Sequence, residues 1–358
     1  MAGVVIGGAP TPAIVGLTQA PGLRVDGLDS VRAFAALSVA LAHVVGPGMP
    51  DLLSRLPVDI GGLADLSQYT FTGHPAVIVF FVVSGFCIHY PFTTRPVPVT
   101  AFWAARWVRI MIPALVSLLF ATSLRIPGFN FVEGYILWSL VCELVYYTVY
   151  PLLSLLSRRV SWLVQFAIAF VVSYLLVGVL GSDQYGNAHI YGPYLNWLIG
   201  LPSWLAGCVL AEQVTQGRYV GDGHPIGLWR VAIVSTASSL YWLTLNTRVG
   251  YYLTLNAFSL LVVFWLGAEI SSARRKGPSA VFEWIGKCSF SIYLFHIIAF
   301  TLIGEVLHPR WTGPQRLMVF PVVLVFCYLA YRMFEEPSHE YARTLFQKLR
   351  KSRLALSW

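Results

Sequence analysis

Charged residues are scarce in this sequence. Asp, Glu, Lys and Arg make up only 11% of its 358 residues, whereas a typical soluble domain has about 25%. Hydrophobic residues make up 57%, and the mean hydropathy is +0.68. This composition excludes an ordinary soluble globular protein. The length accommodates ten membrane spans of about 20 residues each.

Cysteine is also rare, and no two cysteines form a C-x-x-C pair. All five lie in apolar segments, at Cys87, Cys142, Cys208, Cys288 and Cys327. An odd count without such spacing argues against a disulfide framework and against a zinc site. We therefore expect no bound metal, and we interpret these thiols as small packing residues.

The first 23 residues contain no Asp, Glu, Lys or Arg, and Gly and Pro interrupt them repeatedly. A cleaved signal has a basic start and an unbroken apolar stretch, which this segment lacks. We predict a disordered cytoplasmic tail over 1–25, a ten-helix transmembrane domain over 26–334 and a basic cytoplasmic tail over 335–358. The predicted spans are 29–47, 73–92, 103–122, 134–156, 162–181, 194–213, 229–246, 251–270, 283–304 and 317–334.

Positive charge is distributed unevenly between the two sides of these spans. Of the 24 Lys and Arg residues, all but five fall at ends that are cytoplasmic if the N-terminus is cytoplasmic; the five are Arg55, Arg125, Arg248, Arg310 and Arg316. Cytoplasmic loops of membrane proteins carry such an excess. The sequence thus predicts an all-α, polytopic integral membrane protein with both termini cytoplasmic. Its net charge of +8 indicates contact with anionic membrane lipids and no nucleic acid.

Two ionisable residues share one face of the first predicted span. Arg32 and His43 are eleven residues apart, which returns a helix to nearly the same face after a rise of about 16 Å. Ionisable groups inside a membrane usually face a protein interior or a wet cavity and mark function. His74, at the start of the second span, should lie at a similar depth to His43, either as a helix-capping residue or as part of the same site.

Two arginines share a face at the start of the third span. Arg106 and Arg109 are three residues apart. Two guanidinium groups on one face suit a phosphate, which they bind by charge-assisted hydrogen bonds. The alternative is ordinary anchoring of the span at the inner membrane surface.

Polar residues also gather on one face of the fourth and ninth spans. Glu143 lies near the middle of the fourth, with Ser139 and Tyr147 four residues before and after it. Such a carboxyl group must be paired or protonated. It either neutralises a buried cation or orients a catalytic imidazole. In the ninth span, Tyr293 and His296 share a face, and His296 is either a hydrogen-bonded core residue or part of the site.

The order of these motifs resembles the membrane acyltransferase-3 family, the bacterial O-acyltransferases of sugars and polysaccharides. The resemblance covers roughly residues 26–345. It rests on Arg32-x10-His43 after Leu28-Asp29, on Phe80 to Phe86, on Arg106-x-x-Arg109-Ile with Pro113, on Trp138-Ser139-Leu140 through Glu143 and Tyr147 to Pro151, on Ser289 to His296, and on Glu336-Pro337.

The resemblance implies a multi-pass protein of the bacterial inner membrane with an acyl-CoA donor, most often acetyl-CoA. The acceptor would be a hydroxyl group of a carbohydrate or glycoconjugate. His43 would be the catalytic base, and Arg32, Arg106 and Arg109 would bind the donor. Glu143 would act with them at the catalytic centre. The cavity would include His74, Ser139, Tyr147, Tyr293 and His296.

Two other functional classes fit ten helices with intramembrane charges. A transporter or flippase of a polar or glycan substrate is one, although such proteins often show paired broken helices in two related halves, and this sequence has no visible repeat. A membrane subunit or sensor without catalytic activity is the other. The sequence does not distinguish lipopolysaccharide, exopolysaccharide, oligosaccharide, peptidoglycan or macrolide acceptors.

Overall fold

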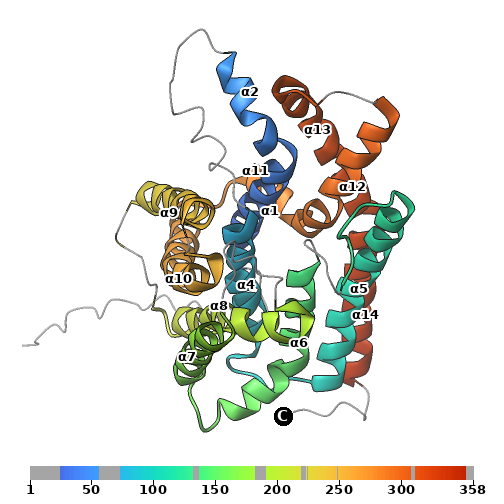
Figure 1. The fold of residues 1–358 in the computed structure, drawn as a ribbon. Helices are drawn as coiled ribbons and strands as arrows, with labels where there is room; N and C mark the ends of the chain where they lie inside the picture. The colour runs from blue at the N-terminus through green and yellow to red at the C-terminus, as the bar shows by residue number, and fades with distance from the viewer. Residues whose placement is uncertain are drawn as a thin grey trace, which may run out of the picture.

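A computed structural model describes residues 25–55, 73–131, 137–181, 191–218, 223, 225–247, 249–307 and 311–351. Within these residues the secondary structure is helical, without strands (Figure 1). The long helices are α1 (Leu28–Val44), α4 (Gly73–His89), α5 (Val99–Ser123), α6 (Trp138–Leu156), α7 (Trp162–Leu180), α8 (Gly192–Thr215), α9 (Ile226–Asn246), α10 (Tyr251–Lys276), α12 (Ser289–Leu307), α13 (Gly313–Ala330) and α14 (Glu336–Lys351). Two shorter helices are α2 (Met49–Ser54) and α11 (Ala280–Lys287). The predicted disordered tail lies outside the described residues, apart from Val25.

The all-α, multi-pass membrane fold predicted from the sequence is confirmed. Eight described helices are long and apolar enough to cross a membrane, and a ninth span results if α1 and the bent segment that follows it are counted as one. The predicted span at 229–246 corresponds to α9, which is not among these eight. Its sequence includes Arg230 and several Ser and Thr residues. The count of ten and the side on which each terminus lies stay predictions.

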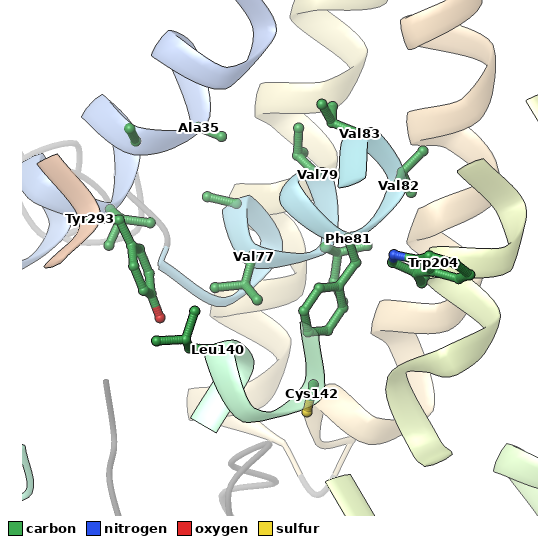
Figure 2. Packing of buried hydrophobic residues seen from close by; sticks show 14 of the residues in the cluster. Ala35, Val77, Val79, Phe81, Val82, Val83, Leu140, Cys142, Trp204 and Tyr293 are labelled. Atoms are coloured by element: carbon green, nitrogen blue, oxygen red, sulfur yellow. The ribbon is translucent and has the colours of Figure 1, made fainter. Parts of the chain in front are cut away.

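The centre of the bundle is formed by α1 and α4, with α8, α11 and α12 packed against them. Buried alanines along α1, at Ala33, Ala35, Ala36 and Ala40, let neighbouring helices approach its backbone closely. Figure 2 shows the α4 side of this core, where Val82 and Phe81 lie near the Trp204 indole of α8.

The α4–α8 crossing depends on two glycines. A Cβ atom on Gly85 would lie 1.9 Å from the backbone oxygen of Trp204, and one on Gly207 would lie 2.0 Å from that of Val82. Small residues at helix crossings permit such close approach in membranes. The contact also fixes Trp204, whose Nε1 donates to Ser84 Oγ at 3.3 Å.

We expect Gly85→Ala to destabilise the fold by about 1–3 kcal/mol, because the added methyl group forces the two backbones apart. The matched control is Gly178→Ala in α7, where a Cβ atom would meet nothing within 4 Å. The measurement is the temperature at which each detergent-solubilised variant loses its monodisperse chromatographic peak. Equal temperatures for Gly85→Ala and wild type would contradict the close crossing.

The predicted span at 283–304 is interrupted near its N-terminal end. Helix α11 ends at Lys287, and α12 begins at Ser289. Gly286 lies directly against α1, since a Cβ atom there would be 1.9 Å from the Asp29 backbone oxygen. The Glu283 carboxylate accepts hydrogen bonds from the backbone nitrogen and Oγ of Ser30. These contacts anchor the first turn of α1, the helix that carries Arg32 and His43.

Helix α13 does not end at the predicted boundary, residue 334. A short π-helical turn (Tyr331–Glu335) joins it to α14, which packs along α5 (Figure 1). Such turns shift the register of a helix and often occur at functional sites. Here the shift buries Glu335, whose carboxylate accepts hydrogen bonds from the Ser291 backbone nitrogen and Oγ. The predicted division of the chain into a membrane domain over 26–334 and a separate tail over 335–358 stays a prediction. Residues 352–358 lie outside the described residues.

Candidate active site

A cavity of about 470 Å³ lies between α1, α4, α5, α6, α12 and α14. Four arginines line it, Arg32, Arg106, Arg109 and Arg343, whereas its acidic lining residues are Asp29 and Glu143. This excess of guanidinium groups over carboxylates favours an anionic ligand. We call it the arginine cavity.

Helix α5 contributes two arginines that are held in different ways. Arg109 Nε donates to His339 Nε2 of α14 at 2.9 Å. The Arg106 guanidinium lies over the rings of Phe102 and Tyr147, at 5.7 and 6.0 Å from their centroids. The prediction that both arginines face one site agrees with their position in the cavity lining. Fixed guanidinium groups lose little side-chain entropy when they bind a phosphate.

Two lining residues, His339 and Arg343, were missed by the sequence analysis. They are four residues apart in α14, on the face toward α5. Their spacing is a helical signal, and they follow the Glu336-Pro337 motif directly. That signal could have placed them in the site if residues 335–358 had been interpreted as a continuation of the last helix.

Arg32 reaches the same cavity from α1. Its guanidinium is 3.6 Å from the Asp29 carboxylate one turn earlier, and 28% of its side chain is exposed. The nearby carboxylate compensates part of its charge, and Arg32 lines the cavity together with Asp29. Arg32 therefore adds a cation from α1 to those that α5 and α14 contribute.

Glu143 of α6 hydrogen-bonds inside the arginine cavity. Its Oε1 accepts from Ser84 Oγ at 2.8 Å and from the Tyr147 hydroxyl. Glu143 thus connects α6 to α4 through its hydrogen bond with Ser84. Among the described residues, the side chain that hydrogen-bonds to His43 is His296, so the interpretation of Glu143 as the group that orients the imidazole is corrected.

A smaller cavity of about 40 Å³ adjoins the arginine cavity. His43, His74 and His296 line it, and Tyr293 and Val77 line both cavities. The Tyr293 hydroxyl hydrogen-bonds to Ser139 Oγ at 2.7 Å. Tyr293 therefore forms part of the wall between the arginines and the histidines. We call the smaller space the histidine cavity.

The two imidazoles in this cavity form a direct hydrogen bond. His43 Nδ1 lies 2.9 Å from His296 Nε2, and the rings are stacked at 5.2 Å. His296 Nδ1 lies 2.8 and 2.9 Å from the backbone oxygens of Ile292 and Tyr293. Carbonyl oxygens only accept, so His296 donates from Nδ1 and, in its neutral form, accepts at Nε2.

This pattern fixes the tautomer of His43. Its Nδ1 donates to His296, which leaves the Nε2 lone pair available as a base. Nε2 faces the start of α4, because a Cβ atom on Gly73 would lie 4.0 Å from it. His43 is exposed whereas His296 is buried, so a substrate can reach the first ring while the second stays in the core.

The end of α1 that carries His43 is held by a residue that sequence reasoning did not select. Arg316 Nη1 of α13 donates to the backbone oxygen of Val44 at 3.0 Å. The Arg316 guanidinium also lies 5.2 Å from the centre of the Phe300 ring. It had been interpreted only as an outer-end charge, and nothing in its spacing pointed to this contact.

The structure thus separates the predicted site residues into two adjoining groups. Arg32, Arg106, Arg109, Glu143, Ser139 and Tyr147 line the arginine cavity, and His43, His74 and His296 line the histidine cavity. Tyr293 belongs to both. One group suits an anion, and the other presents an accessible imidazole.

Comparison with known proteins assigns the family. The family described as "Acyltransferase domain" matches residues 25–332. The acyltransferase MdmB of Streptomyces mycarofaciens is 25% identical, over 88% of this chain and 92% of that protein. No solved structure matches the chain. The chain therefore belongs to the acyltransferase-3 family of multi-pass membrane proteins that its motifs indicated.

Proposed function

We propose that this protein is an O-acyltransferase of the bacterial inner membrane. It moves an acyl group, most often acetyl, from cytosolic acyl-CoA to a hydroxyl group of a sugar, polysaccharide or similar glycoconjugate. The observation that carries the proposal is the adjacency of the two cavities, one with four arginines and one with the free Nε2 of His43. Membership of an acyltransferase family supports it.

The arginine cavity is the donor site in this proposal. Guanidinium groups bind phosphates through paired, charge-assisted hydrogen bonds, and Arg106, Arg109 and Arg343 would hold the nucleotide end of acyl-CoA. From Arg32 to His43, α1 rises about 16 Å. The long pantetheine arm would cover this distance and bring the thioester past Tyr293 to the histidine cavity.

His43 is the base. As the acceptor oxygen bonds to the thioester carbonyl carbon, Nε2 takes the hydroxyl proton. The tetrahedral intermediate then collapses, the carbon–sulfur bond breaks, and the CoA thiolate leaves and takes up a proton. The hydrogen bond to His296 keeps the Nδ1 proton in place and therefore keeps Nε2 free for this transfer.

Negative charge develops on the carbonyl oxygen during the transfer and needs a hydrogen-bond donor. His74 and Tyr293 line the histidine cavity beside His43, and we propose them for this role. An alternative route, in which the acyl group is carried transiently on the imidazole, would use the same Nε2 atom.

The test is transfer of radiolabel from acetyl-CoA in membranes that contain the protein. An O-acyltransferase moves label to an acceptor that mild base then releases, because esters are labile to alkali. Label that remains on the protein without an acceptor would indicate the acyl-histidine route. No transfer in any fraction, with intact protein, would contradict the proposal and favour a transporter or a non-catalytic subunit.

The donor site has its own measurement in the same assay. Arg106→Ala should raise the KM for acyl-CoA about tenfold, since a hydrogen bond to a charged group contributes about 1.5–3 kcal/mol. The KM for the acceptor should stay unchanged. The control is Arg95→Ala, an exposed arginine outside the cavity lining. A changed KM for the acceptor with an unchanged KM for acyl-CoA would contradict the donor-site assignment of Arg106 and place it in the acceptor site.

A further inference from the structure

A second large cavity, of about 350 Å³, lies between α1, α9, α10 and α11. It shares no lining residue with the arginine cavity. Ser30, Val31 and Phe34 of α1 line it, whereas Asp29 and Arg32 line the arginine cavity. Opposite faces of α1 therefore serve two separate spaces, and nothing in the proposed transfer reaction uses the second one.

This second space continues along α1 toward the middle of that helix. A smaller cavity of about 30 Å³ has Phe34 and Ile233 as walls in common with it and is also lined by Ala237 and Phe258. The two together follow α1 from Gly27 to Ser38, a rise of about 16 Å. That is about half the thickness of the hydrocarbon core, so the length matches one acyl chain of one leaflet. We call the combined space the α9 crevice.

The walls of the α9 crevice are mainly apolar, with Val31, Phe34, Ile233, Trp265 and Phe282 among them. In the described part of the chain, α9 packs chiefly against α10 and stands away from α1. Figure 1 shows the α9–α10 pair at one edge of the bundle, with α1 nearer the centre. Such an apolar gap favours an apolar ligand, because burial of apolar surface away from water is favourable.

The wide end of the crevice is polar. Arg230 donates from Nε to Glu269 Oε1 at 2.7 Å and from Nη2 to Oε2 at 3.0 Å. Trp265 Nε1 also donates to this carboxylate, at 2.8 Å. The carboxylate is buried, whereas 62% of the Arg230 side chain is exposed. Its Nη1 has no partner among the described residues, so this nitrogen remains available to donate to a phosphate that enters here.

Two neighbouring elements place this end at the depth of lipid headgroups. Helix α10 finishes with Arg274, Arg275 and Lys276. Helix α11 leaves Val281 and Trp284 exposed, as an amphipathic helix at a membrane surface does. Basic residues beside such a surface attract anionic lipids.

We propose that the α9 crevice binds one anionic phospholipid of the leaflet at this end of the bundle. The phosphate lies at Arg230, and one acyl chain runs along α1 between Phe34 and Ile233. The crevice length, its apolar walls and the half-exposed guanidinium at its mouth carry the proposal. The site is distinct from the acyl-CoA site, because α1 separates the two cavities.

The test is native mass spectrometry of the full chain in detergent, titrated with phosphatidylglycerol or with phosphatidylcholine of the same acyl composition. Wild-type protein should bind one phosphatidylglycerol with a Kd about fivefold below that for phosphatidylcholine, as one basic residue near the surface contributes. Arg230→Gln should remove this difference. Arg158→Gln, at an exposed arginine outside the crevice lining, should retain it.

Two further variants keep the test decisive. Arg230→Gln leaves the Glu269 carboxylate without its cation, although Trp265 still donates to it. The double variant Arg230→Gln/Glu269→Gln instead provides a neutral pair and should lose the preference in the same way. Ile233→Trp fills the chain path and should weaken binding of both lipids. Equal binding of the two lipids by wild type, or an unchanged preference in the double variant, would overturn the headgroup assignment. Unchanged binding by Ile233→Trp would overturn the chain assignment.

Discussion

Replacing His43 with alanine should lower the rate of acyl transfer about 1,000-fold. Alanine cannot accept the hydroxyl proton, and general base catalysis contributes about 10²- to 10⁴-fold. Within the described part of the chain, the His43 side chain hydrogen-bonds only to His296, so the loss should be catalytic rather than structural. The measurement is the initial rate of radiolabel transfer from acetyl-CoA in membranes with matched amounts of wild-type or variant protein.

The same His43→Ala protein should keep its monodisperse chromatographic peak and its affinity for acyl-CoA. Retained binding is expected because the arginines lie in the other cavity. Turnover near the wild-type rate would eliminate His43 as the base. Loss of both the peak and the binding would indicate a structural role instead.

We expect His296 to contribute to the rate of acyl transfer through its hydrogen bonds and not through the volume of its side chain. His296→Leu removes the acceptor for His43 Nδ1 and should lower kcat about 10- to 100-fold, as is typical when a group that orients a functional histidine is lost. His296→Gln should stay within about tenfold of wild type. Its amide can donate to the Ile292 and Tyr293 oxygens while its carbonyl oxygen accepts from His43.

Both His296 substitutions should leave the KM for acyl-CoA unchanged, because His296 does not line the arginine cavity. The measurement is kcat and KM for the three proteins under identical conditions. Equal losses in the glutamine and leucine variants would show that the site needs only the shape of the imidazole. A raised donor KM with normal kcat would contradict the positioning role.

Much of the fold follows from the sequence because its signals are local. Apolar segments of span length predicted the helices, and eight of the described helices are long and apolar enough to cross a membrane. The order of motifs such as Arg32-x10-His43 predicted the family, and the match over residues 25–332 confirms it. The predicted span at 229–246 was harder to interpret, since Arg230 and the Ser and Thr residues of α9 lower its hydropathy, and α9 is not among the eight.

The partners of the site residues could not be predicted in this way. Periodicity shows which residues share a face of one helix, but it does not show which other helix that face meets. Glu143 therefore pairs with Ser84, 59 residues earlier in the chain, and not with His43. His296 meets His43 over a separation of 253 residues. Such contacts depend on how the helices cross, which the glycines at α4–α8 help to decide.

The π-helical turn has a further consequence for the order in which the site is made. The arginine cavity is lined by residues from Val25 onward, but two of its lining residues, His339 and Arg343, come after α13 near the C-terminal end of the chain. Chains are synthesised from the N-terminus, so the bundle can insert before the anion-binding wall exists. A ribosome that stops at residue 335 would release a membrane protein that contains both His43 and His296 but lacks the α14 wall of the arginine cavity.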